Sequence, residues 1–332
     1  HHRTSIKEKM TSHDKINLQI IIGTQDNPYL NLSVESSLLD NYSENTITLF
    51  LWKNRQTVVI GTNQNPYSEC DVETLLNEGG HIARRRTGGG AVYHDLGNLN
   101  FSFIADKKIY DVKRQMTVIQ KALLNFGLET EVSGRNDITY QGRKFSGNAF
   151  AKTKYQGLHH GTIMIKTDGE KLQKYLKVKL SKLHKHGVKS VSSRVINLSE
   201  VADITSENIV PHLIKAFEEV YNNKAVEIRF SDLCTEEVLR SRDHISSKEY
   251  LFGKWKEFST KKSATFDWGS VDIDLDIDED KGIIKNIGIA SDSLEPAAIK
   301  AAMELLKGAS IVNKPVFTED NIIIKDIIEM IY

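Results

Sequence analysis

The chain has 332 residues, and its 44 lysine and arginine residues balance 44 aspartate and glutamate residues, so the formal net charge is zero. This balance argues against a nucleic-acid partner, and the lack of an apolar run near the roughly 18–20 residues of a membrane span argues against a membrane protein. Hydrophobic residues make up 39% and charged residues 27%, which excludes general disorder. Two cysteines, Cys70 and Cys234, are too few for a disulfide framework and fit a reducing compartment.

The length predicts two domains, since a domain typically has roughly 100–200 residues. Residues 1–11 begin His-His, are polar and basic, and lack the apolar stretch of a secretory signal, so we predict a tag remnant or a disordered N-terminus. The pattern of polar and apolar residues changes near Glu249. We therefore predict a catalytic domain over residues 12–246 and an accessory C-terminal domain over residues 247–332.

In the first domain, hydrophobic periodicity and turn residues predict several strands and helices. The expected strands are Ile16–Gly23, Thr46–Trp52, Thr57–Ile60, Ala91–Tyr93, Asn98–Ile104, Ile138–Tyr140, Lys144–Ala151 and Gly161–Ile165. The expected helices are Asn31–Leu39, Asp71–Asn77, Val112–Phe126 and Ile209–Tyr221. The four residues between Thr46–Trp52 and Thr57–Ile60 indicate a hairpin. The polar, proline-free stretch Asn222–Ser247 indicates a flexible connector, on which the C-terminal domain would move during a reaction cycle.

The C-terminal part predicts a small α+β unit of roughly 85 residues, within the usual range for a small domain. Val271–Asp278 alternates apolar and acidic residues, as a half-buried strand does, with Ile283–Ala290 as its partner and a helix at Glu295–Leu306. The alternating aspartates do not form a calcium loop, because an EF-hand needs glycine where Ile277 stands. No βαβ rhythm is present. The expected fold class is α+β, with a mixed, mostly antiparallel sheet flanked by helices.

The stretch from Arg84 to Asn98, RRRTGGGAVYHDLGN, carries the strongest chemical signal. Arginines offer planar donors suited to phosphate or carboxylate, and consecutive glycines let the backbone approach an anion closely. The stretch is neither a P-loop nor a dinucleotide fingerprint, because the residues and glycine spacing of both are missing. A tight glycine turn with exposed arginines is the other interpretation, and the pattern alone leaves both open.

A second stretch joins the turn Gly134–Asp137 to Lys144 and the small residues Gly147 and Ala149. A lysine beside small residues on a strand is a compact point charge that suits a reacting carboxylate and a phosphate. A solvated surface lysine is the alternative. The pair His159-His160 indicates packing or turn chemistry more often than catalysis.

Together these motifs resemble the lipoate–protein ligase A family, within the superfamily of biotin–protein ligases and octanoyl transferases. The resemblance runs from about Leu18 to Leu306. Beyond the two motifs it includes Phe50-Leu51-Trp52, Val58-Val59-Ile60-Gly61, Gln64-Asn65-Pro66, His159-His160-Gly161-Thr162 and Ser190–Leu198. It implies a catalytic domain with a mixed sheet flanked by helices, and a small accessory domain.

The resemblance also implies an activity. Lipoate and ATP would give lipoyl-AMP and pyrophosphate, and the lipoyl group would then pass to a lysine of an acceptor domain. Mg²⁺ would accompany ATP. The implied acceptors are the lipoyl domains of 2-oxoacid dehydrogenase complexes and the glycine-cleavage H protein. A monomer is implied, cytoplasmic in a bacterium and mitochondrial in a eukaryote.

The family's site residues carry over by position. Lys144 aligns with the central catalytic lysine and would contact the lipoate carboxylate, the α-phosphate and the mixed anhydride. The residues implied to bind ATP or lipoyl-AMP are Arg85, Thr87, Gly88, Gly89, Gly90, Ala91, Val92, Tyr93, His94, Asn98, Asp137, Lys144, Gly147, His160 and Gly161. Trp52 would wall the lipoate tunnel with Arg85 and Lys144, although a tryptophan after a strand is also ordinary core. Asp137 either helps to hold Mg²⁺ or braces its loop.

Two rival functions stay open. A lipoyl or octanoyl transferase would use a preformed acyl donor, in some relatives through a cysteine nucleophile. Cys70 lies where the resembled ligase family also carries a cysteine without that role. A binding module that only holds lipoyl domains is the non-enzymatic rival, against which Lys144 and Arg85 argue. The seven lysines of Lys171–Lys189, with no acid among them, form either a solvated face or a patch that steers acidic acceptors.

Overall fold

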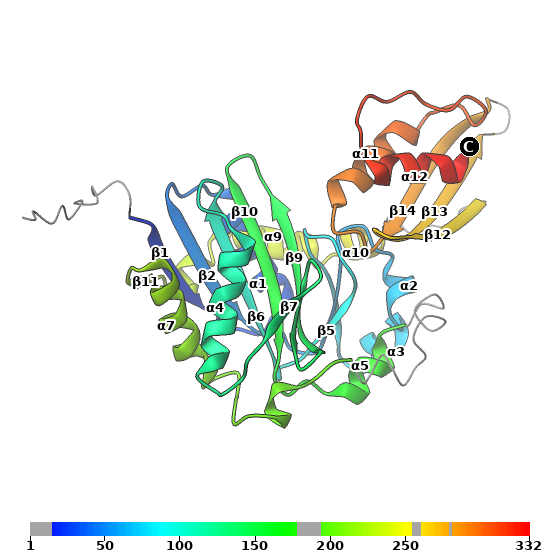
Figure 1. The fold of residues 1–332 in the computed structure, drawn as a ribbon. Coiled ribbons are helices and arrows are strands. Elements are labelled where there is room, and N and C mark those ends of the chain that lie inside the picture. Colours follow the sequence, from blue (N-terminus) through cyan, green and yellow to red (C-terminus); the bar gives the residue numbers. More distant parts are fainter. Residues whose placement is uncertain (1–14, 178–193, 254–259, 279–280) are drawn as a thin grey trace, which may run out of the picture.

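A computed structural model describes residues 15–177, 194–253, 260–278 and 281–332. An eight-stranded sheet, in the order β11-β1-β2-β6-β10-β9-β8-β7, dominates it (Figure 1). Its strands are β1 (Asn17–Ile22), β2 (Thr46–Trp52), β6 (Asn98–Asp106), β7 (Glu131–Ser133), β8 (Asp137–Tyr140), β9 (Arg143–Lys152), β10 (Gln156–Met164) and β11 (Ala225–Glu227). β1 runs parallel to β2 and β11, and the other pairs are antiparallel. The predicted mixed, mostly antiparallel sheet is confirmed.

Helices cover both faces of this sheet, and the alternation along β2 shows how. Leu49 and Leu51 point into a core shared with α4 (Val112–Leu124) and α7 (Ile209–Tyr221). Phe50 and Trp52 point to the opposite face, where α1 (Pro28–Asp40) and α9 (Glu236–Ile245) pack. Successive residues of a strand face opposite sides, so a strand this apolar is buried on both.

The predicted hairpin between β2 and β3 (Thr57–Ile60) is wrong. β3 instead pairs with β4 (His81–Arg84) and β5 (Val92–His94) in a separate three-stranded sheet. Both edges of β2 are already occupied by β1 and β6, so β3 has no edge to join. The linker is also held inward, because the buried side chain of Asn54 is hydrogen-bonded to Asn31 and to His94.

The predicted flexible connector Asn222–Ser247 is also wrong. The segment forms β11, α8 (Phe230–Leu233) and α9, and it buries Phe230 and Val238 in the core against α1. Thr235 caps α9 by accepting from the Val238 amide, ahead of two glutamates in the first turn. That N-terminal signature is the signal that could have predicted this helix.

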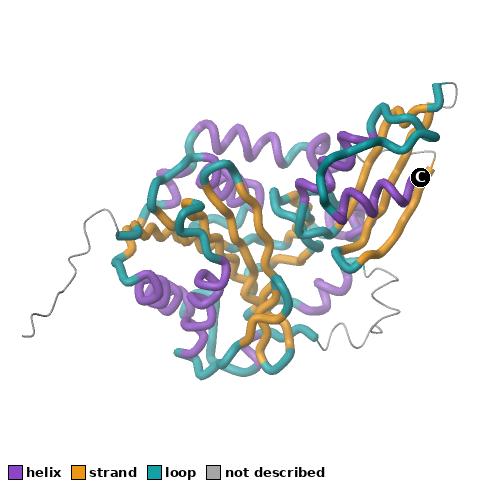
Figure 2. Tube along the Cα trace, turned by 45° about the horizontal axis from the view of Figure 1, so that its top comes forward, coloured by secondary structure: helices purple, strands orange, loops and turns teal. Residues whose placement is uncertain are grey.

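The C-terminal domain has its own core, beside the larger sheet (Figure 1). It contains β12 (Thr260–Phe266), β13 (Gly269–Asp278), β14 (Ile283–Ser291), α11 (Pro296–Leu306) and α12 (Ile322–Ile331). The antiparallel sheet has both helices on one face (Figure 2). Val271, Ile273 and Leu275 are buried while the aspartates between them are not, which confirms the predicted half-buried strand.

The remaining elements are short. They are α2 (Pro66–Glu69), α3 (Val72–Asn77), α5 (Gly169–Tyr175), α10 (Lys248–Phe252) and a 3₁₀ turn at Leu198–Glu200. Asp71 caps α3, which confirms the predicted short helix. Of the lysine-rich segment, residues 178–189 lie outside the described residues. In the described ranges, none of the helices has the length and apolar character that a membrane crossing requires.

Candidate active site

The floor of the site is the face of β2, β6 and β10 that is turned toward α1. Strand register places Trp52, Asn100 and Thr162 in one row, and Ser102 and His160 side by side in the next. The Trp52 indole N–H donates to Ser102 Oγ at 2.8 Å. The structure therefore brings together Trp52 and His160, which are more than a hundred residues apart in the chain.

The glycine loop follows β4 and is shaped by Arg85, which is 6% exposed. Its Nη2 donates to the carbonyl oxygens of Gly88 and Gly90, both at 2.7 Å, and its Nη1 donates to that of Val59 at 3.2 Å. Its Nε donates to Thr87 Oγ1 at 3.0 Å. Burial lowers the pKa of the Arg85 guanidinium to about 10, so it stays a cation at neutral pH.

The three arginines do not form the common anion-facing patch that the sequence suggested. Arg84 is buried and donates to the carbonyl oxygens of Gln64, at 2.7 Å, and of Leu251 in α10, at 2.8 Å. Arg86 points the other way and forms an ion pair with Asp40 at 2.8 Å. β4 ends at Arg84 and the chain then enters the glycine loop, so the three adjacent arginines have three different environments.

The C-terminal domain contacts the glycine loop directly. Gly89 has φ +90°, and its N–H donates to the carbonyl of Ser293 at 2.9 Å. A side chain at Gly88 would collide with the same carbonyl. The Ser291 N–H donates to the Asn63 carbonyl at 3.1 Å, next to the loop. Ser293 was not among the residues that the sequence suggested for the site, because no local pattern marks a contact between residues so far apart in the chain.

Lys144 forms a second cluster beside the floor. Its Nζ lies 2.9 Å from Asp137 Oδ1, and a Cβ at Gly147 would lie 3.1 Å from the same nitrogen. The Gly147 N–H donates to Thr162 Oγ1 at 3.1 Å, which ties the cluster to the first floor row. The Lys144 main chain is fixed by hydrogen bonds to Arg194 and Ile196, while its side chain is 41% exposed. The lysine is thus held at its base and open at its tip.

His94 is buried at the other end of the floor. Its Nδ1 lies 3.1 Å from the Asn54 amide nitrogen and 3.5 Å from that of Asn100, which in turn accepts from Asn98. Among the described residues, His94 Nε2 has no hydrogen-bond partner. Burial, with Arg85 adding repulsion, lowers the pKa of His94 to about 3. The imidazole is therefore neutral at physiological pH and can offer one N–H donor.

The other predicted residues are explained in part by packing. The Tyr93 ring is buried against Tyr175, with centroids 5.6 Å apart, so the loop side of Ala91, Val92 and Tyr93 has mainly backbone groups to offer. A side chain at Gly161 would collide with Phe101. Core packing alone thus accounts for this glycine, and its binding role stays a prediction.

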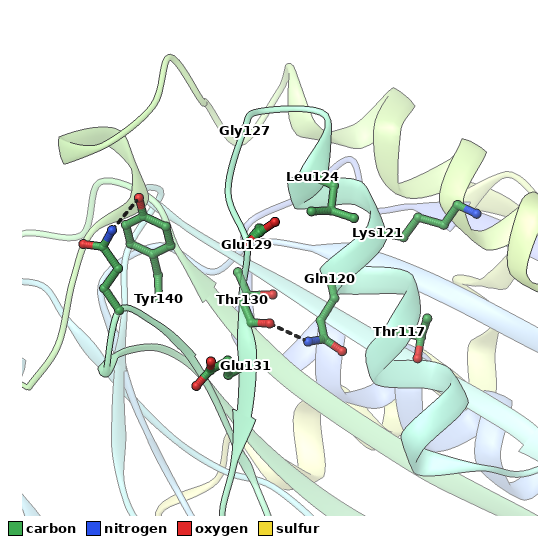
Figure 3. A pocket seen from close by; sticks show the side chains of 10 residues that line it. Thr117, Gln120, Lys121, Leu124, Gly127, Glu129, Thr130, Glu131 and Tyr140 are labelled. Carbon is green, nitrogen blue, oxygen red and sulfur yellow. Dashed lines mark hydrogen bonds between the residues drawn. The ribbon is translucent and has the colours of Figure 1, made fainter.

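One cleft has no lining residue from these clusters, and a second includes Trp52 of the floor. The first, of about 920 Å³, opens between α4 and the β7–β8 region (Figure 3). It is lined by Thr117, Gln120, Lys121, Leu124, Gly127, Glu129, Thr130, Glu131, Tyr140 and Gln141, none of which is a predicted site residue. A smaller cleft, of about 270 Å³, includes Trp52 and is bordered by the ion pair of Lys53 and Glu207 at 3.1 Å. Of the three predicted tunnel residues, only Trp52 lines it.

The donor set for a metal ion is sparse. In the part of the chain that the structure describes, no group of three or more His, Cys, Asp or Glu side chains is arranged to hold one. Asp137, beside Lys144, is a single carboxylate that is 34% exposed. Mg²⁺ is commonly held by one or two carboxylates together with substrate phosphates, so this donor set fits a metal that arrives with a nucleotide.

The mixed sheet, its flanking helices and the C-terminal domain define a ligase fold of the lipoate–protein ligase class. Residues 27–218 match the family described as the lipoyl protein ligase A/B catalytic domain, and residues 256–319 match the bacterial lipoate protein ligase C-terminus. The chain belongs to the lipoate–protein ligase family and is an enzyme of that class.

Curated relatives extend over most of the chain. It is 39% identical to the lipoate-protein ligase A of Bdellovibrio bacteriovorus over 302 residues, which cover 88% of each protein. It is 36% identical to that of Psychrobacter cryohalolentis over 298 residues, 87% of each.

Solved structures of lipoate ligases are also similar to this chain. P. falciparum LipL1 in complex with lipoate has a TM-score of 0.81 at 30% identity, over 94% of this chain and 98% of that one. A bipartite lipoate protein ligase from Thermoplasma acidophilum, solved in a study of that ligase and its E2 lipoyl domain, has a TM-score of 0.64 at 25% identity, covering 74% and 100%. A lipoate-protein ligase A bound with ATP has a TM-score of 0.60 at 25% identity, covering 73% and 98%.

Proposed function

We propose that this chain activates lipoate with ATP and transfers the lipoyl group to protein lysines. In the first half-reaction a lipoate carboxylate oxygen attacks the α-phosphorus, the bond to pyrophosphate breaks, and lipoyl-AMP forms. In the second, an acceptor lysine amine attacks the acyl carbon, AMP leaves, and the amine gives up one proton. The observation that carries the proposal is the placement of Lys144 beside the same sheet face over which the Arg85-braced glycine loop lies.

The chemistry requires positive charge at the reacting centre, because an anionic carboxylate approaches an anionic phosphate. Lys144 supplies it: the ammonium group is accessible, and Asp137 holds it at 2.9 Å. When substrate binds, the carboxylate and the α-phosphate replace solvent around the ammonium. Arg85 acts differently, since its donors hold the carbonyl oxygens of Gly88 and Gly90 and so fix which way the loop amides point.

Neutral donors complete the proposed nucleotide contacts. His94 is neutral and buried, and its unpartnered Nε2 and the nearby Asn98 are suited to orient a ligand without adding charge. Backbone amides of residues 88–93, other than that of Gly89, which donates to Ser293, supply the remaining donors, with Gly90 leaving open space in front of the chain. Trp52 serves as an apolar wall for the acyl chain. The roles of Thr87, Gly147, His160 and Gly161 in binding the adenylate belong to the same proposal.

Mg²⁺ is proposed to bind Asp137 together with the ATP phosphates, where it would neutralise phosphate charge. With the metal bound, the Asp137 carboxylate would contact both the Lys144 ammonium and the ion. Asp137 lies opposite Gly147 in the β8–β9 register and is partly open to solvent, so a second partner has room to reach it.

The proposed acceptors are lipoyl domains of 2-oxoacid dehydrogenase complexes and the glycine-cleavage H protein, modified by a monomeric enzyme. The E2 lipoyl domain paired with the Thermoplasma ligase supports the first. We propose residues 12–246 as the catalytic domain and 247–332 as the accessory domain, because the two parts have separate cores. α10 then forms the junction, held to the catalytic domain through Arg84 and Leu251.

The transferase alternative with a cysteine nucleophile finds no support at Cys70. The thiol is fully buried, donates to the Pro66 carbonyl, and has its pKa raised to about 12 by burial. A nucleophilic cysteine needs a low pKa and access to substrate. Cys234, the other cysteine, also has a raised pKa because of burial.

Exchange of labelled pyrophosphate into ATP tests the proposal, with lipoate, octanoate and biotin supplied in parallel. Lipoate-dependent exchange that disappears in Lys144→Ala is the expected result. Absence of exchange, combined with transfer from supplied lipoyl-AMP to a lipoyl domain, would refute the activation step and favour the transferase. Neither exchange nor transfer, with retained binding of lipoyl domains, would favour the binding module.

A further inference from the structure

A continuous chain of buried hydrogen bonds links the glycine loop to helix α1. Thr87 Oγ1 lies 2.6 Å from His160 Nε2, and His160 Nδ1 lies 2.9 Å from Glu35 Oε2. Arg85 Nε donates to the same Thr87 hydroxyl at 3.0 Å. Glu35 is 2% exposed and Thr87 is 0% exposed, so water does not compete for these contacts. Glu35 was not among the residues that the sequence suggested.

The chain continues from Glu35 to the proposed wall of the acyl site. Ser102 Oγ donates to Glu35 Oε2 at 2.5 Å, and the Trp52 indole N–H donates to Ser102 Oγ at 2.8 Å. Five separate segments, α1, β2, the loop after β4, β6 and β10, thus each contribute a side chain to one network. Glu35 lies at its centre, where the branch from Trp52 meets the branch from His160.

The chemistry of the two ends fixes where the protons lie. Trp52 Nε1 and Arg85 Nε can only donate, so the Ser102 and Thr87 hydroxyls accept from them and use their own protons elsewhere. Ser102 therefore donates to Glu35, and Thr87 donates to His160 Nε2. A neutral His160 that accepts at Nε2 carries its proton on Nδ1 and donates it to Glu35. A carboxylate at Glu35 receives both donors, so every proton in the network has one assigned place.

The same contacts could also be interpreted as a catalytic triad, but substrate cannot reach the Thr87 hydroxyl. A hydroxyl on Nε2 of a histidine whose Nδ1 faces a carboxylate is the arrangement of a nucleophile, a base and an orienting acid. Thr87 would then be an acyl acceptor. Its hydroxyl, however, is fully buried and lies between Arg85 and His160, which leaves no path for an acyl carbon. The network serves to hold groups in place.

We propose that Glu35 is a positioning residue that sets the tautomer of His160 and, through Thr87, the orientation of Arg85 and the glycine loop. This inference rests on the proposed function. Thr87 Oγ1 accepts from Arg85 Nε and so helps to orient the guanidinium that holds the carbonyl oxygens of Gly88 and Gly90. Because Trp52 joins the same carboxylate, Glu35 also connects the proposed acyl wall to the proposed nucleotide loop.

Glu35→Gln tests the proposal, because it keeps the size of the side chain and removes its charge. Ser102 and His160 both donate to Oε2, and an uncharged amide oxygen accepts more weakly than a carboxylate. The imidazole proton is then held less firmly on Nδ1, and the acceptor of the Thr87 proton is partly lost. We expect kcat/KM for ATP in pyrophosphate exchange to fall about 10- to 100-fold, the range seen when an orienting partner behind a ligand is removed. Asp106→Asn is the matched control, since Asp106 is also a 2% exposed carboxylate with hydrogen-bond donors, away from the loop.

Two further measurements separate positioning from general stability. In a double-mutant cycle, Glu35→Gln should add little to His160→Gln, because one residue acts through the other. Nitrogen chemical shifts of the imidazoles, assigned by comparison with His160→Gln, should show His160 protonated at Nδ1 in the wild-type chain and a larger share of it protonated at Nε2 in Glu35→Gln.

Unchanged exchange kinetics in Glu35→Gln, additive losses in the cycle, an equal loss in Asp106→Asn, or a wild-type His160 protonated at Nε2 would each overturn the proposal. The wild-type chemical shift decides the matter even if Glu35→Gln fails to fold. A wild-type chain without lipoate-dependent exchange would sink the proposed function instead. The tautomer comparison is then still informative, so the two failures can be told apart.

Discussion

Replacing Gly89 by alanine is expected to weaken ATP binding through the backbone of the glycine loop. Gly89 has φ +90°, a conformation that residues with a Cβ adopt only under strain. A Cβ there would lie 3.2 Å from Arg85 Nη2 and 3.4 Å from the Leu294 side chain. Arg85 cannot move away freely, because its other donors are held by Val59 and Thr87.

The magnitude follows from these two contributions. A left-handed backbone costs a residue other than glycine roughly 1–2 kcal/mol. If the loop relaxes by turning the Gly89 peptide, the carbonyl oxygens of Gly88 and Gly90 leave Arg85, and the loop amides lose the orientation that the proposed phosphate contacts require. Since about 1.4 kcal/mol corresponds to a factor of ten, kcat/KM for ATP should fall about 5- to 30-fold.

Pyrophosphate exchange at varied ATP concentration measures this loss, and urea unfolding measures the stability of the same variant. Gly127→Ala is the matched control: Gly127 has φ +75° with open space around it, at the end of α4. It should lose a similar amount of stability while its KM for ATP stays within about twofold of wild type, since the strain is the same and the site is untouched.

Wild-type kinetics for Gly89→Ala would refute the reasoning, because the triple glycine would then be only a turn. An equal rise in the KM for ATP in Gly127→Ala would also refute it, since the effect would then follow global stability.

Three further results are expected. Lys144→Ala should lower the adenylation rate about 10²–10³-fold, which corresponds to the loss of ~3–4 kcal/mol typical of a transition-state stabiliser. Lys152 is an exposed lysine at the end of the same strand, and Lys152→Ala should leave the rate unchanged. Near wild-type exchange in folded Lys144→Ala would contradict the assignment. Cys70→Ala should keep exchange and transfer within about threefold of wild type, because burial makes the thiol inert, and loss of transfer alone would revive the transferase. Burial lowers the pKa of both His94 and His159 to about 3, below the unfolded value near 6.5, so their contribution to stability is complete above pH 6.5 and is lost as pH falls toward 3, by about 1.4 kcal/mol per pH unit for each imidazole. Urea unfolding from pH 7 to pH 4.5 should show a shallower decline for His159→Gln, and an unchanged slope would contradict the assignment.

The sequence by itself determined the features that depend on neighbours along the chain. Period-two alternation identified Val271–Asp278 as a strand with one buried face, because that pattern is local to the strand. Helix signals at Val112–Phe126 and Ile209–Tyr221 were sufficient for the same reason. The resemblance motifs also marked Arg85, the triple glycine and Lys144, since the residues that we propose for the anion site lie in two short stretches of the chain.

Tertiary structure alone decided which side chains meet. Glu35 lies on a helix with an ordinary alternation of polar and apolar residues, and nothing local distinguishes it from an exposed glutamate; only the packing of α1 over β6 and β10 brings it to His160. Strand pairing is equally non-local. The predicted hairpin was wrong because β2 pairs with β1 and β6. The predicted flexible connector was wrong because α9 is stabilised by burial against α1.

Neighbouring residues of one type also show which properties the sequence determines and which the tertiary structure decides. Arg84 and Arg85 look equivalent in the sequence, as do His159 and His160. In an extended chain successive side chains point to opposite faces, and what each face meets depends on distant segments. His159 therefore lies in the core with Gln115 and Asn148, while His160 lies in the site with Thr87 and Glu35. Residue type sets what a side chain can donate or accept, and the fold sets the partner, because the partner comes from elsewhere in the chain.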